Sequence, residues 1–119
     1  MMDVGACYAN YNADMTRTIP VSGKFSRRQK QVYNAVLRVL RQMIGSATVG
    51  TQHSEWQKES ELLMNEELLE LGLISKAGIK RQTPEKRACR EYYMHGLGHP
   101  LGLDVHDVHT ANPRLEDGR

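Results

Sequence analysis

Cysteine is scarce in this 119-residue chain, which contains only Cys7 and Cys89. The two thiols form no CxxC pair and no signal peptide is recognisable, so a reducing cytoplasm is the simplest location and a disulfide framework is not expected. Long apolar runs are also missing, and none approaches the ~20 residues of a membrane-spanning helix. The sequence therefore predicts a cytoplasmic protein without a membrane anchor.

A large excess of one charge is absent as well. Lys and Arg number 16 and Asp and Glu 14, which leaves a net charge of +2 without a concentrated basic stripe. Such a surface offers little to phosphate groups, so no nucleic-acid partner is expected. Apolar residues make up 39% of the chain and charged residues 25%, which is typical of a folded globular protein. The length allows one domain.

The residues that are present predict strands at the front of the chain and helices in its middle. Residues 4–11 are rich in small and aromatic side chains, and residues 14–21 contain β-branched Thr, Ile and Val before a Ser-Gly turn signal. These two segments predict a hairpin that turns through residues 10–13. Further along, Pro84 predicts a short helix through Arg90, and residues 92–94 predict another strand.

Two amphipathic helices are predicted between these regions. The first begins at the capping box formed by Ser26 and Gln29 and runs to Gly45. The second runs from His53 to Leu71 and ends at Gly72. Their apolar residues recur at helical spacing: Val32, Val36, Val39, Leu40 and Met43 in the first, and Trp56, Leu63, Leu68 and Leu71 in the second.

Residues suited to chemistry gather at the two ends of the chain. Asp3 and Asp14 lie eleven residues apart on the predicted hairpin, so both carboxylates can face one cavity and share a cation or a proton. Aspartates at such places are also ordinary turn and surface residues. The spacing alone leaves both interpretations open.

Three histidines follow near the other end, in the segment HGLGHPLGLDVHD. They are His95, His99 and His106, and three glycines among them permit close backbone approaches. Imidazole beside carboxylate suits Mn, Fe, Co or Zn better than Ca or Mg. Histidines in such a segment can instead satisfy buried hydrogen bonds, so composition alone does not decide between a metal or catalytic role and a structural one.

Both end segments resemble motifs of one enzyme family. DVGACYANYNADMTRTIPVSGKFS resembles the signature DxGxxxxxYxxDxTRTxxxxGxF, and HGLGHPLGLDVHD resembles HGxxHxxGLxVHD. Both signatures belong to the pita-bread metallopeptidases of the Xaa-Pro aminopeptidase and prolidase branch. The two motifs occur in the order and at the separation that this family has. Methionine aminopeptidases share the fold but lack this histidine element.

The resemblance implies a role for each of these residues. Asp3 would bind one metal ion, Asp14 would bridge two, and His99 would complete the ligands of the second. His95 and His106 would contact the substrate as catalytic residues, with Thr16 and Arg17 supporting Asp14. The family's cofactor is a divalent metal, typically two Mn²⁺ with Zn²⁺ or Co²⁺ as alternatives, and its substrate is a peptide with proline at the second position.

The sequence also departs from the family pattern. Two further glutamate ligands would be expected beyond the histidine element, and Glu116 resembles a surface turn residue rather than either of them. Pro100 replaces a bulky aromatic residue, and His109 replaces a glycine. The amino-terminal domain and the last strands of the family would also be missing, which predicts weak metal binding, exposed apolar surface and self-association into a homo-oligomer.

The resulting prediction is an α+β fold over residues 1–119. It would be a partial pita-bread (creatinase/aminopeptidase-like) metallopeptidase catalytic domain, with antiparallel strands and two main helices on one face. The predicted function is Xaa-Pro aminopeptidase or dipeptidase activity through a metal-activated water, with this chain alone weakly active or inactive. The alternatives are a binding module without enzymatic activity and a purely structural oligomer.

Overall fold

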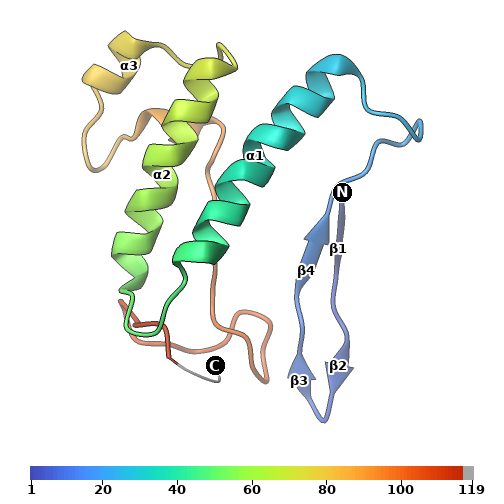
Figure 1. Cartoon of the computed structure of the whole chain (residues 1–119). Coiled ribbons are helices and arrows are strands. Elements are labelled where there is room, and N and C mark those ends of the chain that lie inside the picture. Colours follow the sequence, from blue (N-terminus) through green and yellow to red (C-terminus); the bar gives the residue numbers. More distant parts are fainter. Residues whose placement is uncertain (117–119) are drawn as a thin grey trace.

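A narrow β-hairpin and a pair of long helices make up most of the regular secondary structure in this computed structural model, which describes residues 1–116 (Figure 1). Both helices lie on the same side of the hairpin, with the nearer one between the hairpin and the other helix. After the short helix α3 (Lys76–Lys80), the chain runs back along the second helix, and residues 113–115 lie beside the first turn of that helix. No helix in the described part is long and apolar enough to cross a membrane.

The two arms of the hairpin keep the same pairing register along their length, but the strand pairing is interrupted in the middle. Asp3 pairs with Thr16 at one end, and Tyr8 pairs with Tyr11 at the other. The interruption divides each arm, so the two predicted strands are four short ones: β1 (Met2–Val4), β2 (Cys7–Tyr8), β3 (Tyr11–Asn12) and β4 (Met15–Arg17).

The turn of this hairpin lies earlier than the predicted residues 10–13. Ala9 and Asn10 both have positive φ, at 51° and 68°, as the two central residues of a tight hairpin turn require. At the interruption, a Cβ added to Gly5 would lie 1.7 Å from the carbonyl oxygen of Ala13. Only glycine allows the two arms to approach so closely immediately before Asp14.

Helix α1 (Arg27–Ser46) begins as the sequence predicts. The Ser26 side chain accepts a hydrogen bond from the backbone of Gln29, and the Gln29 side chain accepts one from the backbone of Ser26, so the capping box is confirmed. The helix carries two apolar faces. One face is buried and consists of Ala35, Val39 and Met43, whereas Val32, Val36 and Leu40 remain between 37% and 50% exposed on the other.

Helix α2 (His53–Glu70) packs against the buried face of α1. Met64 and Leu68 join the core with Val39 and Met43, and Trp56 and Leu63 pack on its margin. The Trp56 Nε1 donates to the carbonyl oxygen of Met43 at 3.0 Å, which joins the start of α2 to the end of α1. The prediction of this helix is confirmed, and three of its four predicted apolar residues pack in or against the core, whereas Leu71 lies just beyond the helix and does not join the core.

The segment after α2 differs most from expectation. Helix α3 (Lys76–Lys80) was not predicted, and the predicted helix over residues 84–90 is replaced by a short 3₁₀ helix, η1 (Ala88–Glu91). The strand predicted at residues 92–94 was wrong, because no neighbouring strand in residues 1–116 pairs with it. A β-strand requires a partner strand for its backbone hydrogen bonds, and local propensity does not show whether such a partner is present.

The two thiols should differ sharply in reactivity. Cys89 is fully buried, and burial raises the pKa of its thiol, with Glu61 adding to the effect, whereas Cys7 is exposed. A raised pKa leaves less thiolate at a given pH, so at pH 8 a thiol reagent such as DTNB should label Cys7 alone. Labelling of Cys89 should require denaturant. Equal rates for both thiols in the folded chain would contradict this packing.

Candidate functional site

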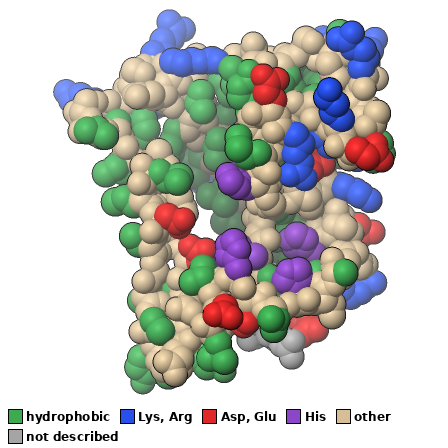
Figure 2. Space-filling model, turned by 180° about the vertical axis from the view of Figure 1, so that it is seen from behind, with side chains coloured by type: hydrophobic (Ala, Val, Ile, Leu, Met, Phe, Trp, Pro, Cys, Tyr) green, Lys and Arg blue, Asp and Glu red, His purple; other side chains and the backbone are tan. Residues whose placement is uncertain are grey.

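The two ends of the chain meet where the hairpin approaches the histidine segment. Asp14 directly precedes β4, and its Oδ2 lies 3.1 Å from Nε2 of His99, which is 85 residues later in the sequence. Both side chains retain somewhat more than a quarter of their surface exposed. Figure 2 shows histidine side chains gathered on this face with acidic side chains around them. The pairing of carboxylate with imidazole that the motifs suggest is therefore present.

The other ring nitrogen of His99 determines what this contact can do. Nδ1 lies 3.0 Å from the carbonyl oxygen of Pro100, which can only accept a hydrogen bond. With the proton on Nδ1, the lone pair of Nε2 points at Asp14, and two acceptors then face each other. A second proton on the imidazole or a divalent cation bound by both atoms resolves this conflict. A carboxylate oxygen with a neutral imidazole is a donor set that Mn²⁺, Zn²⁺ and Co²⁺ accept.

His106 also belongs to this cluster. Its ring centroid lies 3.9 Å from that of His99, with the ring planes inclined at 44°. His95 is exposed, and its side chain makes no hydrogen bond within residues 1–116. Of the two histidines expected to contact substrate, the structure thus places one directly against the Asp14–His99 pair and leaves the other free at the surface.

Asp3 is near the site without completing it. Its Oδ1 accepts a hydrogen bond from Oγ1 of Thr16 at 2.7 Å, across the β1–β4 pair. Alternation along the strand puts Thr16 and Asp14 on one face, so Asp3 shares that face. Even so, no group of three or more potential ligands among residues 1–116 is close enough to hold one ion. Within the described residues, the Arg17 side chain donates to the Thr16 carbonyl oxygen and makes no hydrogen bond or ion pair with Asp14.

Asn12 joins the hairpin to the histidine segment and was not recognised from the sequence. Its backbone N–H donates to the carbonyl oxygen of Gly102 at 2.9 Å, and its side-chain Nδ2 donates to the carbonyl oxygens of Gly102 and Leu103 at 3.3 and 2.6 Å. Asn12 is two residues from Asp14, and Gly102 is three residues from His99. These bonds therefore set how closely Asp14 approaches His99.

The loop that receives Asn12 requires a glycine. Gly102 is buried, and a Cβ there would lie 1.8 Å from Oδ2 of Asp107. Its N–H donates to the Asp104 carbonyl oxygen, and the Asp107 N–H donates to the Pro100 carbonyl oxygen. The loop is thus closed by its own backbone, which gives Asn12 a defined acceptor.

A second polar cluster lies behind the histidine segment. Glu61 is only 6% exposed on the inner face of α2, and it pairs with Arg90 and, at 3.5 Å, with Arg87. The sequence analysis missed this cluster, because a single glutamate in a helix is usually a surface residue. Its only sequence signal is its position, since Glu61 falls in line with Met64 and Leu68 on the buried face.

The chain belongs to metallopeptidase family M24, whose profile matches residues 1–119. It is 40% identical over 108 residues to the Xaa-Pro aminopeptidase of Haemophilus influenzae and 36% identical over 117 residues to a probable Xaa-Pro aminopeptidase of Paracoccidioides lutzii. These matches cover 91% and 98% of this chain but only 25% and 24% of the relatives. The chain therefore spans about a quarter of their length.

The solved structures agree with this family membership. Zinc-substituted aminopeptidase P of Escherichia coli, in complex with product, is 37% identical and has a TM-score of 0.80, with 91% of this chain and 24% of that one covered. The hairpin and the two helices correspond to part of the pita-bread domain of that enzyme. The prediction of the family and of the fold class is confirmed.

The hairpin should loosen when the Asn12 side chain is removed. Asn12→Ala deletes both side-chain hydrogen bonds to the loop, and at about 1 kcal/mol each the free energy of unfolding should fall by ~1–2 kcal/mol. Urea unfolding followed by circular dichroism measures the change. The matched control is Asn34→Ala in α1, which should stay within ~0.5 kcal/mol of the parent. An equal loss in both variants would show that the Asn12 bonds are not special.

Proposed function

We propose that this chain carries part of the active site of a metal-dependent peptidase that hydrolyses the bond before a proline at the amino terminus of a peptide. The observation that carries the proposal is the 3.1 Å approach of Asp14 Oδ2 to His99 Nε2, with Nδ1 held at the Pro100 carbonyl oxygen. Membership in a metallopeptidase family supports it, as do relatives named Xaa-Pro aminopeptidase. Dipeptidase activity of the prolidase type is the variant of this function that differs only in substrate length.

Three side chains of this chain would hold the metal. Asp14 and His99 supply a carboxylate oxygen and an imidazole nitrogen that already converge, and Asp3 supplies a second carboxylate on the same face of the hairpin. Mn²⁺ is the ion we propose, in a pair, with Zn²⁺ or Co²⁺ able to use the same donors. A bound ion of this kind supplies Lewis acidity that activates water and polarises a peptide carbonyl.

The remaining residues would act on the substrate and on the ligands. His106 lies against the ring of His99 and can donate a hydrogen bond to a peptide oxygen placed beside the Asp14–His99 pair. His95 lies at the other end of the histidine segment, where its exposed side chain can contact a substrate. Thr16 orients Asp3 through its hydroxyl. The chain would work in the cytoplasm, where free thiols such as Cys7 persist.

The metal proposal is tested by calorimetry with MnCl₂ and ZnCl₂. The parent chain should bind weakly, because no three donors among residues 1–116 are preassembled, and Asp14→Ala should weaken binding by roughly tenfold or more. Asp104 is an exposed aspartate of the histidine segment, and the control variant Asp104→Ala should leave binding unchanged. Binding that is equal in all three proteins would place the metal elsewhere and remove Asp14 from the site.

Cleavage of a short Xaa-Pro peptide in the presence of Mn²⁺ separates the functions. If the parent chain slowly releases the amino-terminal residue and Asp14→Ala does not, the peptidase function is supported. Metal-dependent peptide binding without any release favours the alternative, a binding module without enzymatic activity.

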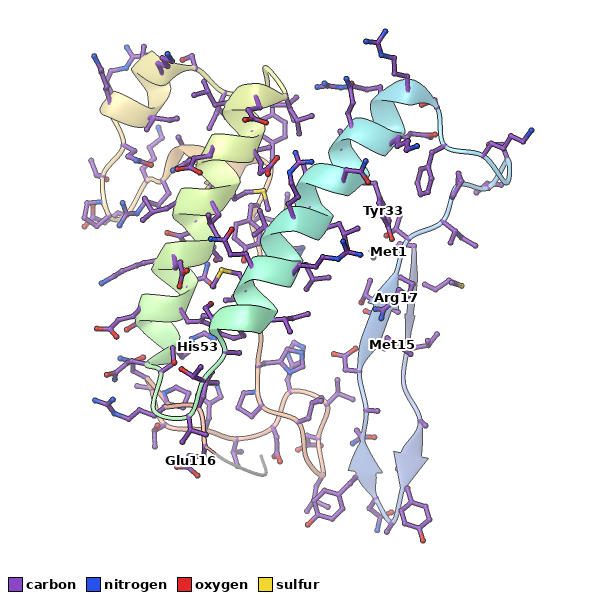
Figure 3. The ribbon with its side chains drawn as sticks, in the orientation of Figure 1. Met1, Met15, Arg17, Tyr33, His53 and Glu116 are labelled. Carbon is purple, nitrogen blue, oxygen red and sulfur yellow. The ribbon has the colours of Figure 1, made fainter. Side chains whose placement is uncertain are left out.

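We also propose that the chain self-associates through the outer face of α1. A groove of about 1190 Å³ lies between β4 and this face, and Met15 and Tyr33, which line it, mark its two sides in Figure 3. Within residues 1–116, β4 pairs only with β1, so its other edge is open to a strand from a second copy. An open edge beside an apolar groove is the kind of surface that a copy of the hairpin can cover.

Light scattering or sedimentation velocity tests the self-association. The parent chain should be larger than a monomer, and Leu40→Glu, which puts a charge into the groove, should shift it toward the monomer. Leu62→Glu is the matched control, since Leu62 is a similarly exposed leucine of α2 that does not line the groove. A monomeric parent chain, or an equal response of both variants, would contradict the proposal.

A further inference from the structure

We infer that Glu61, Arg90 and Gln57 together act as a positioning device that holds the backbone of residues 94–98, which carries His95 and leads directly into His99. The inference deepens the proposed function and depends on it for its chemical meaning. The starting point is a buried carboxylate. Glu61 lies in the middle of the inner face of α2, where apolar packing is the ordinary solution, and a charge there is costly unless it is paired.

Arg90 uses its guanidinium group to link Glu61 with the histidine segment. One terminal nitrogen, Nη2, donates to Glu61 Oε1. The other, Nη1, lies 3.4 Å from the carbonyl oxygens of both Met94 and His95. The rigid planar fork of arginine suits this double contact, whereas the single ammonium group of lysine does not reproduce it. The carboxylate thereby fixes the direction from which Arg90 reaches the backbone of His95.

Gln57 makes a parallel connection one helical turn earlier. Its Nε2 donates to Glu61 Oε1 at 3.2 Å, and its Oε1 accepts a hydrogen bond from the Leu97 N–H at 2.6 Å. The first residue of α2, His53, adds a contact of 3.2 Å between its Nε2 and the Gly98 carbonyl oxygen. Figure 3 shows His53 at the foot of the helix, on the side of the last segment of the chain.

These contacts replace regular secondary structure. Residues 94–98 belong to no helix or strand, so their backbone groups have no ladder of hydrogen bonds to define their path. Four of the five residues have a backbone group held by a side chain of α2 or of η1: Met94, His95, Leu97 and Gly98. The positions of His95 and His99 relative to Asp14 therefore depend on α2.

The first test removes one acceptor and leaves the charges in place. Gln57→Leu deprives the Leu97 N–H of its partner, and hydrogen–deuterium exchange at that amide should become about fivefold faster or more. Gln57→Glu keeps the acceptor oxygen for Leu97 but replaces the donor to Glu61 by a second carboxylate, so the protection at Leu97 should be restored only in part. The Val39 amide, in the core of α1, reports global opening and should not change. Unchanged exchange at Leu97, or an equal change at Val39, would overturn the proposal.

The second test removes the buried charges as a unit. The triple variant E61L/R87M/R90M replaces the Glu61 carboxylate and both of its arginine partners by apolar side chains of similar size, a change that buried ionic groups often tolerate without loss of folding. It should keep its helical circular dichroism, exchange the Leu97 amide faster, and bind Co²⁺ roughly tenfold more weakly than the parent. The single variant Arg90→Lys should lie between the parent and the triple variant in both measurements. A folded triple variant with parental exchange and affinity would overturn the proposal. If the triple variant does not fold, the two Gln57 variants decide.

The two tests distinguish this inference from the proposed function. If the parent chain binds no Co²⁺, the metal proposal fails, while exchange at Leu97 still reports whether Gln57 and the ion pair hold the segment. If Co²⁺ binds and exchange at Leu97 is the same in every variant, the metal proposal stands and the positioning role is overturned.

Discussion

The pairing of one buried carboxylate constrains much of the structure. Glu61 is almost completely removed from water, and the cost of burying its charge is met only if cations reach it. Arg87, immediately before η1, and Arg90, within it, do so, and the chain after α3 must therefore return to the inner face of α2. Once that path is set, the following residues run along α2 toward His53. The position of the histidine segment is thus a consequence of an electrostatic requirement in the core.

The hairpin depends on a different and smaller set of contacts. Its hydrogen bonds to the rest of the described chain come from Asn12 and Asp14 and reach only residues 99–103. The candidate site therefore lies on the junction between a helical part, where α2 holds the histidines, and a hairpin held at one place. A site built across such a junction is sensitive to changes in either part, and the distance between Asp14 and His99 reports on both.

The sequence predicts best what depends on near neighbours. The Ser26–Gln29 capping box and the helical spacing from Val32 to Met43 are local, and both predict α1 correctly. Residues 92–94 were predicted as a strand because Tyr has strand propensity, but a strand also needs a partner, and none is present in the described chain. Glu61 and Asn12 could not be found, because Arg90 is 29 residues from Glu61 and the loop partners of Asn12 are 90 or more residues away from it. The motifs predicted the approach of Asp14 to His99 only through the family resemblance.

The strongest physical argument for a cation at the site comes from His99 itself. Each ring nitrogen faces an oxygen that accepts hydrogen bonds, Pro100 O at Nδ1 and Asp14 Oδ2 at Nε2. A neutral imidazole has one N–H, so one of the two contacts lacks a positive partner. With that N–H on Nδ1, the contact with Asp14 needs a second proton or a metal ion; with it on Nε2, the contact with Pro100 needs a second proton. With the proton on Nδ1, the lone pair of Nε2 is directed toward the carboxylate, which is the orientation that histidine ligands have in metal sites.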